Sequence, residues 1–200
     1  MPRTKERVNK INKVVQNRQK GAVVLEDITD PHNASAVFRS CDAFGIQDVY
    51  LIFDKQPVFD PKKIGKLSSS SANRWLDFHV FDSIDSCYKE LKEKGFTTIA
   101  TTLDERSDDI YRTDFVEDEN IALIFGNEHS GLSQQAIEKA DKKMYIPMNG
   151  MVQSLNISVT AAICLFEMSR QRLYSTISGG KPFSFSSQDQ EELTKSLLTR

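Results

Sequence analysis

Residues Ile121-Ala122-Leu123-Ile124-Phe125 form an uninterrupted apolar run, and Gly126 follows directly. A strand that is apolar at every position is predicted to be buried on both faces, because a half-exposed strand would alternate polar and apolar residues. Strands of this kind are typical of parallel sheets that are covered by helices on both sides. The run therefore predicts an α/β fold.

Segments of similar character occur on both sides of this run. We predict further strands at residues 22–26, 48–53, 78–81, 96–101 and 144–146. Helical patterns predict helices at residues 34–44, 83–94, 133–140 and 154–176. Strands that alternate with helices indicate a mostly parallel sheet with helices on both faces.

The last predicted helix changes character along its length. Its first half is apolar all round, so we expect it to be buried, whereas from Ser169 onward it becomes polar and basic and is expected to leave the core. Two connections look irregular. Residues 66–75, rich in Ser and Lys, predict a loop or short helix, and the acidic residues 104–119 predict a loop.

The length of 200 residues, with 39% hydrophobic and 27% charged content, is typical of one main globular domain. Around the main domain of residues 21–176 we expect a basic helix within residues 1–20 and a tail of residues 177–200. The apolar runs are shorter than the roughly 20 residues that span a membrane, and the basic start leads into no apolar signal segment. We therefore expect a soluble, cytoplasmic protein without membrane contact.

The net charge of −2 is unevenly distributed along the chain. Residues 1–20 carry seven basic residues and one acidic residue, a balance of +6, which leaves about −8 for the remainder. A basic end on an acidic body indicates an arm that binds a polyanion such as RNA, since phosphate neutralisation supplies most nonspecific nucleic-acid affinity. A solvated surface helix is the alternative interpretation.

The cysteines and histidines form no close group. Cys41, Cys87 and Cys164 lie far apart, and the three histidines are equally scattered. Neither a zinc site nor a disulfide framework has such spacing, so we predict reduced cysteines and no metal.

Two common α/β functions are disfavoured by the loops after the strands, where ligands usually bind. No G-x-G-x-x-G follows a strand, and the spacing of Gly126 and Gly131 continues into Leu132-Ser133 rather than the Lys-Ser/Thr of a phosphate-binding loop. A dehydrogenase is therefore a weak hypothesis. The absence of G-x-S-x-G likewise disfavours a serine hydrolase.

Three segments resemble the motifs of the SPOUT methyltransferases, in particular the SpoU/TrmH branch, which methylates ribose 2′-oxygens in RNA. The segments are NASAVFRSCDAFG at residues 33–45, IFGNEHSGLS at residues 124–133 and IPMNGMVQSLNISVTA at residues 146–161. They occur in the order of the family, and the similarity covers residues 5–175. Residues 148–153 and the short basic end look closest to enzymes that methylate guanosine 18 of tRNA.

The resemblance implies a SPOUT fold with a deep trefoil knot in its carboxyl-terminal part, a homodimer, and S-adenosyl-L-methionine as cofactor. The main domain of residues 21–176 would be the methyltransferase domain. The cofactor would be surrounded by the loops that contain Thr101, Leu103, Gly126, Ile146, Met148 and Leu155. Ile146, Met148 and Leu155 suit an apolar slot for adenine.

The resemblance makes Arg39 the catalytic residue. On a helical wheel, Arg39 lies away from the stripe of Ala34, Val37 and Cys41, so we expect it to face outward. A guanidinium rarely gives up its proton, which leaves two roles open: a base activated by RNA phosphate, or a charged clamp that stabilises the developing oxyanion. His129 is a weaker candidate base, since no orienting partner is evident.

The other matched polar positions are Asn33, Glu128, Ser154 and Asn156. We expect them to arrange the ribose, the cofactor carboxylate and Arg39. The alternatives are that Asn33 caps the helix of residues 34–44, that Ser154 or Asn156 caps the last helix, and that the Glu128 carboxylate ties a loop. RNA contact is expected from Arg7 and Lys10 of the basic helix and from Arg170 and Arg172. Further basic candidates are Lys62, Lys63, Lys66 and Arg74.

Two alternatives stay open. The RNA target could be ribosomal RNA or another tRNA position, although ribosomal-RNA relatives often add an amino-terminal domain, and a short basic arm favours tRNA. The other alternative is a non-catalytic RNA-binding protein that keeps the same fold.

Overall fold

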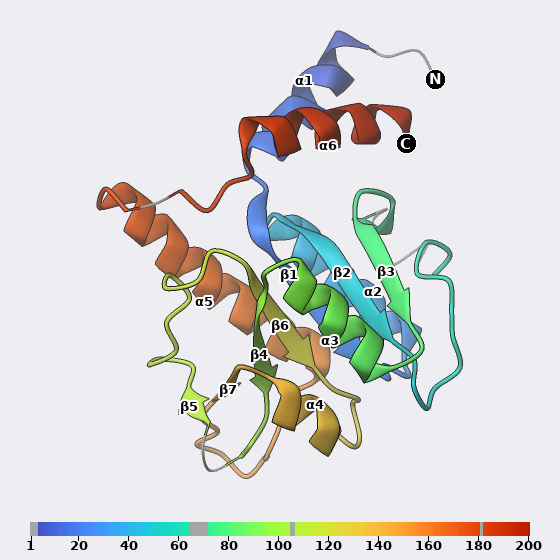
Figure 1. The fold of residues 1–200 in the computed structure, drawn as a ribbon, viewed down its shortest axis with the longest axis vertical. Helices are drawn as coiled ribbons and strands as arrows, with labels where there is room; N and C mark the ends of the chain where they lie inside the picture. Colours follow the sequence, from blue (N-terminus) through green and yellow to red (C-terminus); the bar gives the residue numbers. More distant parts are fainter. Residues whose placement is uncertain (1–3, 65–71, 105–106, 181) are drawn as a thin grey trace.

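The computed structural model describes residues 4–64, 72–104, 107–180 and 182–200 (Figure 1). The strands are β1 Gln19–Glu26, β2 Ile46–Ile52, β3 Asp77–Phe81, β4 Thr97–Thr101, β5 Asp108–Asp109, β6 Ile121–Phe125 and β7 Lys142–Tyr145. The helices are α1 Lys5–Gln16, α2 Pro31–Ala43, the short 3₁₀ helix η1 Ala72–Arg74, α3 Ile84–Glu93, α4 Gln134–Lys139, α5 Ile157–Ile177 and α6 Ser187–Thr199.

The strands form one parallel sheet in the order β3-β2-β1-β6-β4-β7-β5. β1 and β6 lie side by side near its middle, with Val24 opposite Ile124. Successive residues of β1 point to opposite faces: Val23 and Leu25 join the core under α2 and α5, and Val24 joins the core under α3 and α4. The predicted parallel sheet with helices on both faces is confirmed.

Helix α2 carries the first motif and is set at both ends by local chemistry. Asp30 is its N-cap and accepts a hydrogen bond from the His32 N–H at 2.8 Å, and Pro31 fits the first turn. Asn33 lies inside the helix, so the alternative role of Asn33 as cap is wrong. The helix ends before Gly45, which has a φ of +77° that favours glycine. A Cβ at this position would lie 2.6 Å from the Asn17 carbonyl oxygen, which leaves no room for a side chain.

Helix α5 differs from the prediction. Its first half was expected to be buried all round, yet Val159 is 45% exposed and Phe166 is 56% exposed. The second half leaves the core as expected at Leu173 and Ile177, which are exposed, but Arg172 is only 2% exposed. Composition alone cannot distinguish an apolar side chain that packs inside the fold from one left on its surface.

The two ends of the chain pack together above the sheet (Figure 1). Ile11 and Val15 of α1 meet Leu193 and Leu197 of α6 in a separate small core. Helix α6 begins with a capping box between Ser186 and Asp189, so the predicted tail contains a helix of 13 residues. Helix α1 ends at Gln16 rather than near Gly21, because β1 already begins at Gln19.

Cys41, Cys87 and Cys164 are free thiols, and all three are buried. Across the described ranges, no helix is long and apolar enough to cross a membrane. In the same part of the chain, no group of three or more His, Cys, Asp and Glu side chains could hold a metal ion.

Candidate active site

Three side chains from the three sequence motifs form a continuous hydrogen-bonded chain. The Asn156 Nδ2 donates to Asn33 Oδ1 at 3.0 Å, and the Asn33 Nδ2 donates to Glu128 Oε1 at 3.1 Å. Each residue follows the carboxyl end of a different strand: Asn33 after β1, Glu128 after β6 and Asn156 after β7. Parallel strands bring these loops to one edge of the sheet, where α/β proteins usually bind ligands.

Glu128 accepts the most hydrogen bonds in this network of three side chains. Besides Asn33, its carboxylate accepts bonds from the Thr29 N–H at 3.1 Å, the Thr29 hydroxyl at 2.8 Å and the Asp30 N–H at 3.1 Å. Partial burial alone would raise the pKa of Glu128, but the bonds from Asn33, the backbone and Thr29 outweigh it and lower the pKa to about 2. Glu128 is therefore an anion that ties the loop after β6 to the start of α2.

Asn156 has a second task as the N-cap of α5. Its Oδ1 accepts bonds from the Ser158 N–H at 2.8 Å and the Ser158 hydroxyl at 2.6 Å. Ser154, the other residue that could have capped this helix, lies outside the cap and is exposed. One side chain therefore couples the start of α5 to the start of α2.

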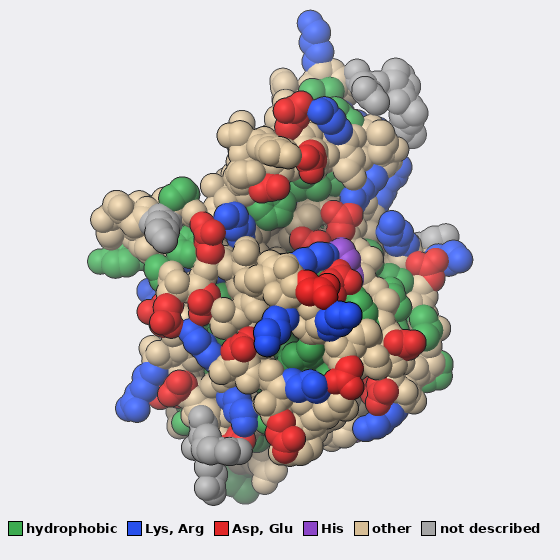
Figure 2. All heavy atoms as spheres, viewed as in Figure 1, with side chains coloured by type: hydrophobic (Ala, Val, Ile, Leu, Met, Phe, Trp, Pro, Cys, Tyr) green, Lys and Arg blue, Asp and Glu red, His purple; other side chains and the backbone are tan. Residues whose placement is uncertain are grey.

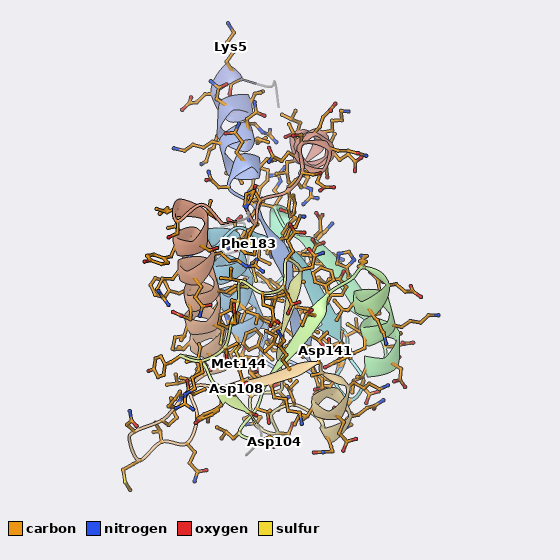
Figure 3. The ribbon with its side chains drawn as sticks, turned by 60° about the vertical axis from the view of Figure 1, so that its left-hand side comes forward. Lys5, Asp104, Asp108, Asp141, Met144 and Phe183 are labelled. Atoms are coloured by element: carbon orange, nitrogen blue, oxygen red, sulfur yellow. The ribbon has the colours of Figure 1, made fainter. Side chains whose placement is uncertain are left out.

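A pocket opens beside this network, at the carboxyl ends of β4 and β7. Five of the six residues expected to surround a cofactor line this pocket: Thr101, Leu103, Ile146, Met148 and Leu155. Ser154 lines it as well. Met144 also lines it, and Figure 3 shows this residue close to Asp108, its neighbour in β5. The structure thus gathers residues from two separate loops into one pocket.

Gly126, the sixth expected cofactor residue, is not among the residues that line the pocket. A Cβ at Gly126 would lie 2.1 Å from the Gly131 carbonyl carbon and 2.1 Å from the Leu132 nitrogen. Only glycine permits this approach of the backbone to itself. Its role in this structure is to let the loop of residues 126–132 fold tightly.

The residues of the pocket fit S-adenosyl-L-methionine chemically. Ile146, Met148 and Leu155 present apolar side chains, which suit an adenine ring. Among the described residues, the backbone of 146–155 forms no hydrogen bond with other backbone groups, so its N–H and carbonyl groups are open to a ligand. An apolar slot edged by open backbone groups is the arrangement that a purine requires.

Arg39 lies on α2, the same helix that begins next to Glu128. Its side chain is exposed, as the helical wheel predicts, while Ala34, Val37 and Cys41 are fully buried. Within the described part of the chain, the guanidinium of Arg39 takes part in no hydrogen bond or ion pair. The guanidinium is therefore open to an anionic ligand.

The basic residues expected to contact RNA lie at different places in the structure. Arg7, Lys10 and Arg74 line a groove between α1 and α6, and Lys62 and Lys63 are exposed. Lys66 lies outside the described residues. Figure 2 shows basic and acidic side chains interspersed on the face with α3 in front, where Lys139 pairs with Asp85 at 2.8 Å.

Arg172 corrects the sequence prediction. Its guanidinium donates to the carbonyls of Phe115 at 3.1 Å and Glu119 at 3.2 Å and to that of Lys20, and it lies over the Phe183 ring. Burial lowers the pKa of Arg172 to about 10. It holds distant segments together inside the fold and is not available to RNA, whereas Arg170 is exposed and pairs with Glu167 at 2.7 Å.

Sequence reasoning missed the residues that hold Glu128. Thr29 supplies two of its hydrogen bonds, and Asn127, next to Glu128, donates to the Asp27 carbonyl at 2.7 Å. A lone threonine in a loop carries no pattern in a single sequence. The sequence Asp30-Pro31-His32-Asn33, which is typical of a turn that caps a helix, is the local signal closest to this loop.

The parallel α/β fold, with this network and pocket at the carboxyl ends of its strands, defines a methyltransferase of the SPOUT class. Residues 20–166 match the SpoU rRNA methylase family, and the chain belongs to this family. Among its relatives is the tRNA (guanosine(18)-2′-O)-methyltransferase of Thermus thermophilus, 38% identical over 174 residues, which are 86% of each chain. The protein of the same name from Aquifex aeolicus is 34% identical over 84% of this chain and 77% of the relative.

Solved structures agree with this assignment. The A. aeolicus TrmH/SpoU tRNA modifying enzyme superimposes with a TM-score of 0.84, at 31% identity, over 97% of this chain and 95% of that chain. The SpoU methyltransferase AviRb from Streptomyces viridochromogenes, solved in complex with AdoMet, has a TM-score of 0.68 at 27% identity, over 81% of this chain and 64% of that chain.

Proposed function

We propose that this chain transfers a methyl group from S-adenosyl-L-methionine to the ribose 2′-hydroxyl of guanosine 18 in tRNA. The observation that carries the proposal is the network of Asn33, Glu128 and Asn156 beside a pocket that suits the cofactor. The similarity to the T. thermophilus enzyme, which covers 86% of both chains, supports the choice of tRNA.

The cofactor supplies an electrophilic methyl group on a sulfonium centre. Leu103, Ile146, Met148 and Leu155 would enclose the adenosine part, since these side chains bound the pocket. Ser154 lies at the same pocket and offers a hydroxyl at its polar side. These residues bind and orient the cofactor and exclude water, which alignment of the methyl group with an attacking oxygen requires.

Arg39 would act on the RNA. An exposed guanidinium with no protein partner can bind a phosphate through two parallel hydrogen bonds and stay charged beside the reacting hydroxyl. A charged Arg39 would stabilise the oxyanion that develops as the 2′-oxygen loses its proton. We favour this clamp over a deprotonated Arg39, since a solvent-exposed guanidinium retains its proton.

Asn33, Glu128 and Asn156 would position Arg39 rather than move protons. Their amide and carboxylate groups are already paired with one another and with the loop at Thr29. They fix the start of α2 to the start of α5, and therefore fix Arg39 relative to the cofactor pocket. Productive geometry of this kind accounts for a large part of enzymatic rate enhancement.

RNA would also be held by the basic helix α1. Arg7 and Lys10 line the groove between α1 and α6, whereas the face with α3 in front carries mixed charge. Phosphate contacts predict that affinity falls steeply with salt. Substituting Arg7 and Lys10 by Gln should flatten this dependence, and a binding constant indifferent to salt would contradict the assignment.

The exposed face of α5 supports a homodimer. Val159, Ala162 and Phe166 border a shallow apolar groove with Ala36 and Ser40 of α2. Exposed apolar side chains gathered in one place mark association sites, so a second copy would cover this face. The trefoil knot and a cytoplasmic location also stay part of the proposal, both from family resemblance.

The main competing substrate is ribosomal RNA. The 23S rRNA (guanosine-2′-O-)-methyltransferase RlmB of Ralstonia nicotianae is 36% identical over 75% of this chain and 58% of the relative. The match to the T. thermophilus tRNA enzyme, which covers 86% of both chains, favours tRNA. Labelled methyl transfer to bulk tRNA and to ribosomal RNA, followed by mapping of the modified nucleotide, tests the proposal: label at position 18 of tRNA is expected.

Two results would redirect this assignment. Label in ribosomal RNA or at another tRNA position would replace the substrate. Failure of the protein to bind S-adenosyl-L-methionine in calorimetry would favour a non-catalytic RNA-binding protein on the same fold.

A further inference from the structure

Asp27, at the carboxyl end of β1, has an unusual backbone conformation. Its φ is +50°, and it is the one non-glycine residue with positive φ among those described. It is also buried, with 7% of its surface exposed. Side chains disfavour this left-handed region, although aspartate tolerates it better than most residues. Surrounding contacts must therefore maintain the conformation.

The carboxylate of Asp27 organises the loop after β2. Its Oδ1 accepts hydrogen bonds from three successive backbone N–H groups, those of Asp54 at 2.9 Å, Lys55 at 2.9 Å and Gln56 at 3.1 Å. The Asp27 N–H donates in turn to the Ile52 carbonyl at 2.8 Å. Hydrogen bonds to an ionised oxygen are stronger than neutral ones, so these contacts fix Asp27 against β2.

The backbone carbonyl of Asp27 organises a different loop, the one that carries Glu128. It accepts the bond from Asn127 Nδ2 at 2.7 Å, and the Asn127 Oδ1 accepts from the N–H groups of His129 at 2.8 Å and Ser130 at 3.2 Å. Asn127 and Gly131 also exchange two backbone hydrogen bonds, at 2.9 and 3.0 Å. Asn127 thus closes the turn that contains Glu128 and docks it on Asp27.

A neighbouring contact fixes the same loop at its far end. Glu26 is 3% exposed, and its Oε2 accepts a hydrogen bond from the Ser133 N–H at 3.0 Å. The loop of residues 126–133 is therefore seated on the end of β1 at two points, Glu26 and Asp27. The residues that follow Asp27 in the sequence include Thr29, Asp30 and Asn33, which donate hydrogen bonds to the Glu128 carboxylate.

We propose that Asp27 is a positioning residue for methyl transfer: by joining the loops after β1, β2 and β6, it places Glu128 and Asn33 so that α2 presents Arg39 correctly. This inference rests on the proposed function. Asp27 touches neither the pocket nor Arg39 and acts through Asn127 and the loop of residues 28–30. Misplacement of reacting groups by about 1 Å can cost about 100-fold in rate.

The test compares Asp27→Ala, Asp27→Gly, Asp27→Asn and Asn127→Asp in the full chain. Glycine permits positive φ but removes the acceptor, and asparagine keeps both. Asn127→Asp replaces the donor to the Asp27 carbonyl by a charged oxygen, which breaks this hydrogen bond. Thr98→Val is the matched control, because it removes a buried hydroxyl bonded to Asp141 at 2.7 Å, away from the site. The readouts are kcat, the KM for S-adenosyl-L-methionine, the unfolding midpoint and the carboxyl pKa of Glu128 by carbon-13 NMR.

We expect Asp27→Ala, Asp27→Gly and Asn127→Asp to lower kcat about 10- to 100-fold with a nearly unchanged KM for the cofactor. The pKa of Glu128 should rise in these variants from about 2 towards its ordinary value. Asp27→Asn should stay within about threefold of the parent in kcat, and Thr98→Val should lose stability but not turnover.

Retention of kcat and of the low Glu128 pKa in Asp27→Ala would overturn the inference, as would an equal loss of kcat in Thr98→Val. If Asp27→Ala does not fold, Asp27→Gly decides, because it removes the acceptor without straining the backbone; retention of kcat and of the low Glu128 pKa in that variant would likewise overturn the inference. If the parent protein transfers no methyl group at all, the proposed function fails, and the NMR titration alone then decides whether Asp27 positions Glu128.

Discussion

The Asn156 amide donates to the Asn33 Oδ1 at 3.0 Å, a contact between residues 123 positions apart in the chain. It joins the first turn of α2 to the N-cap of α5, and so connects the helix that carries Arg39 to the helix that borders the cofactor pocket. Each of these two asparagines contributes with both atoms of its amide group. Several consequences of this arrangement can be measured.

Asn156→Asp separates the two tasks of this residue. Aspartate keeps an oxygen that caps α5, so the free energy of unfolding should stay within about 0.5 kcal/mol of the parent. It loses the donor to Asn33, so we expect kcat to fall about tenfold. Asn156→Ala should lose turnover and also lower the free energy of unfolding by about 1 kcal/mol. The control is Ser83→Ala at the cap of α3, which should lose a similar free energy but leave turnover intact. Full activity of Asn156→Asp would disprove the link between the helices.

Acid should weaken the fold through Glu128. The pKa of Glu128, about 2, lies below the value of about 4.3 expected in an unfolded chain. The stabilising contribution of this carboxylate is therefore complete above about pH 4.3 and is lost as the pH falls towards 2. Glu128→Gln should destabilise the protein by about 1–2 kcal/mol at neutral pH, and the difference from the parent should shrink towards pH 2. Urea unfolding at several pH values measures this, with the exposed Glu191→Gln as control. A difference that is constant with pH would contradict the assigned pKa.

Arg39→Lys tests the phosphate clamp. Lysine keeps the charge but cannot form two parallel hydrogen bonds, so we expect kcat to fall about 10- to 100-fold with unchanged cofactor affinity. Single-turnover methyl transfer at saturating tRNA measures the effect, and Arg112→Lys, also an exposed arginine, is the control. A variant that kept most of its turnover would make the bidentate geometry unnecessary.

Arg172 and Arg170, two positions apart, should behave oppositely. Arg172→Met leaves several buried carbonyls without donors, and we expect it to lower the free energy of unfolding by about 2–4 kcal/mol. Arg170→Met removes a surface ion pair that contributes less than about 1 kcal/mol. Denaturant unfolding compares the two, and RNA affinity of the folded Arg172→Met protein should match the parent. Equal stability of the two variants would refute a structural role for Arg172.

The exposed face of α5 predicts a change of oligomeric state. Phe166→Asp places a charge on the apolar groove and should convert a dimer into monomers, since a buried charge without a partner is unfavourable. Sedimentation equilibrium measures the mass, and Leu173→Asp, farther along the same helix, shows how far the interface extends. A parent protein that is monomeric at micromolar concentration would contradict the proposed dimer.

Local patterns determined much of this protein. The apolar run of Ile121–Phe125 predicted its strand with the observed bounds, and helical spacing correctly placed Arg39 on the outer side of α2. The resemblance to the SpoU/TrmH motifs, rather than a local pattern, indicated Asn33, Glu128 and Asn156 as site residues. Burial periodicity and short motifs are properties of neighbouring residues, so a single sequence contains them.

Tertiary structure alone decided the remainder. Arg172 is buried because its carbonyl partners come from β1 and from residues 115–119, whereas Phe166 is 56% exposed although the Phe44 ring packs against one side of it. Asp30 rather than Asn33 caps α2 because the helix starts at Pro31, and the Asn33 Oδ1, the atom that would accept a capping bond, accepts instead from Asn156, 123 residues away. Such contacts depend on how distant segments are brought together by strand order and register. Residue types and spacing determined which side chains could form this site, and the fold determined which of them meet.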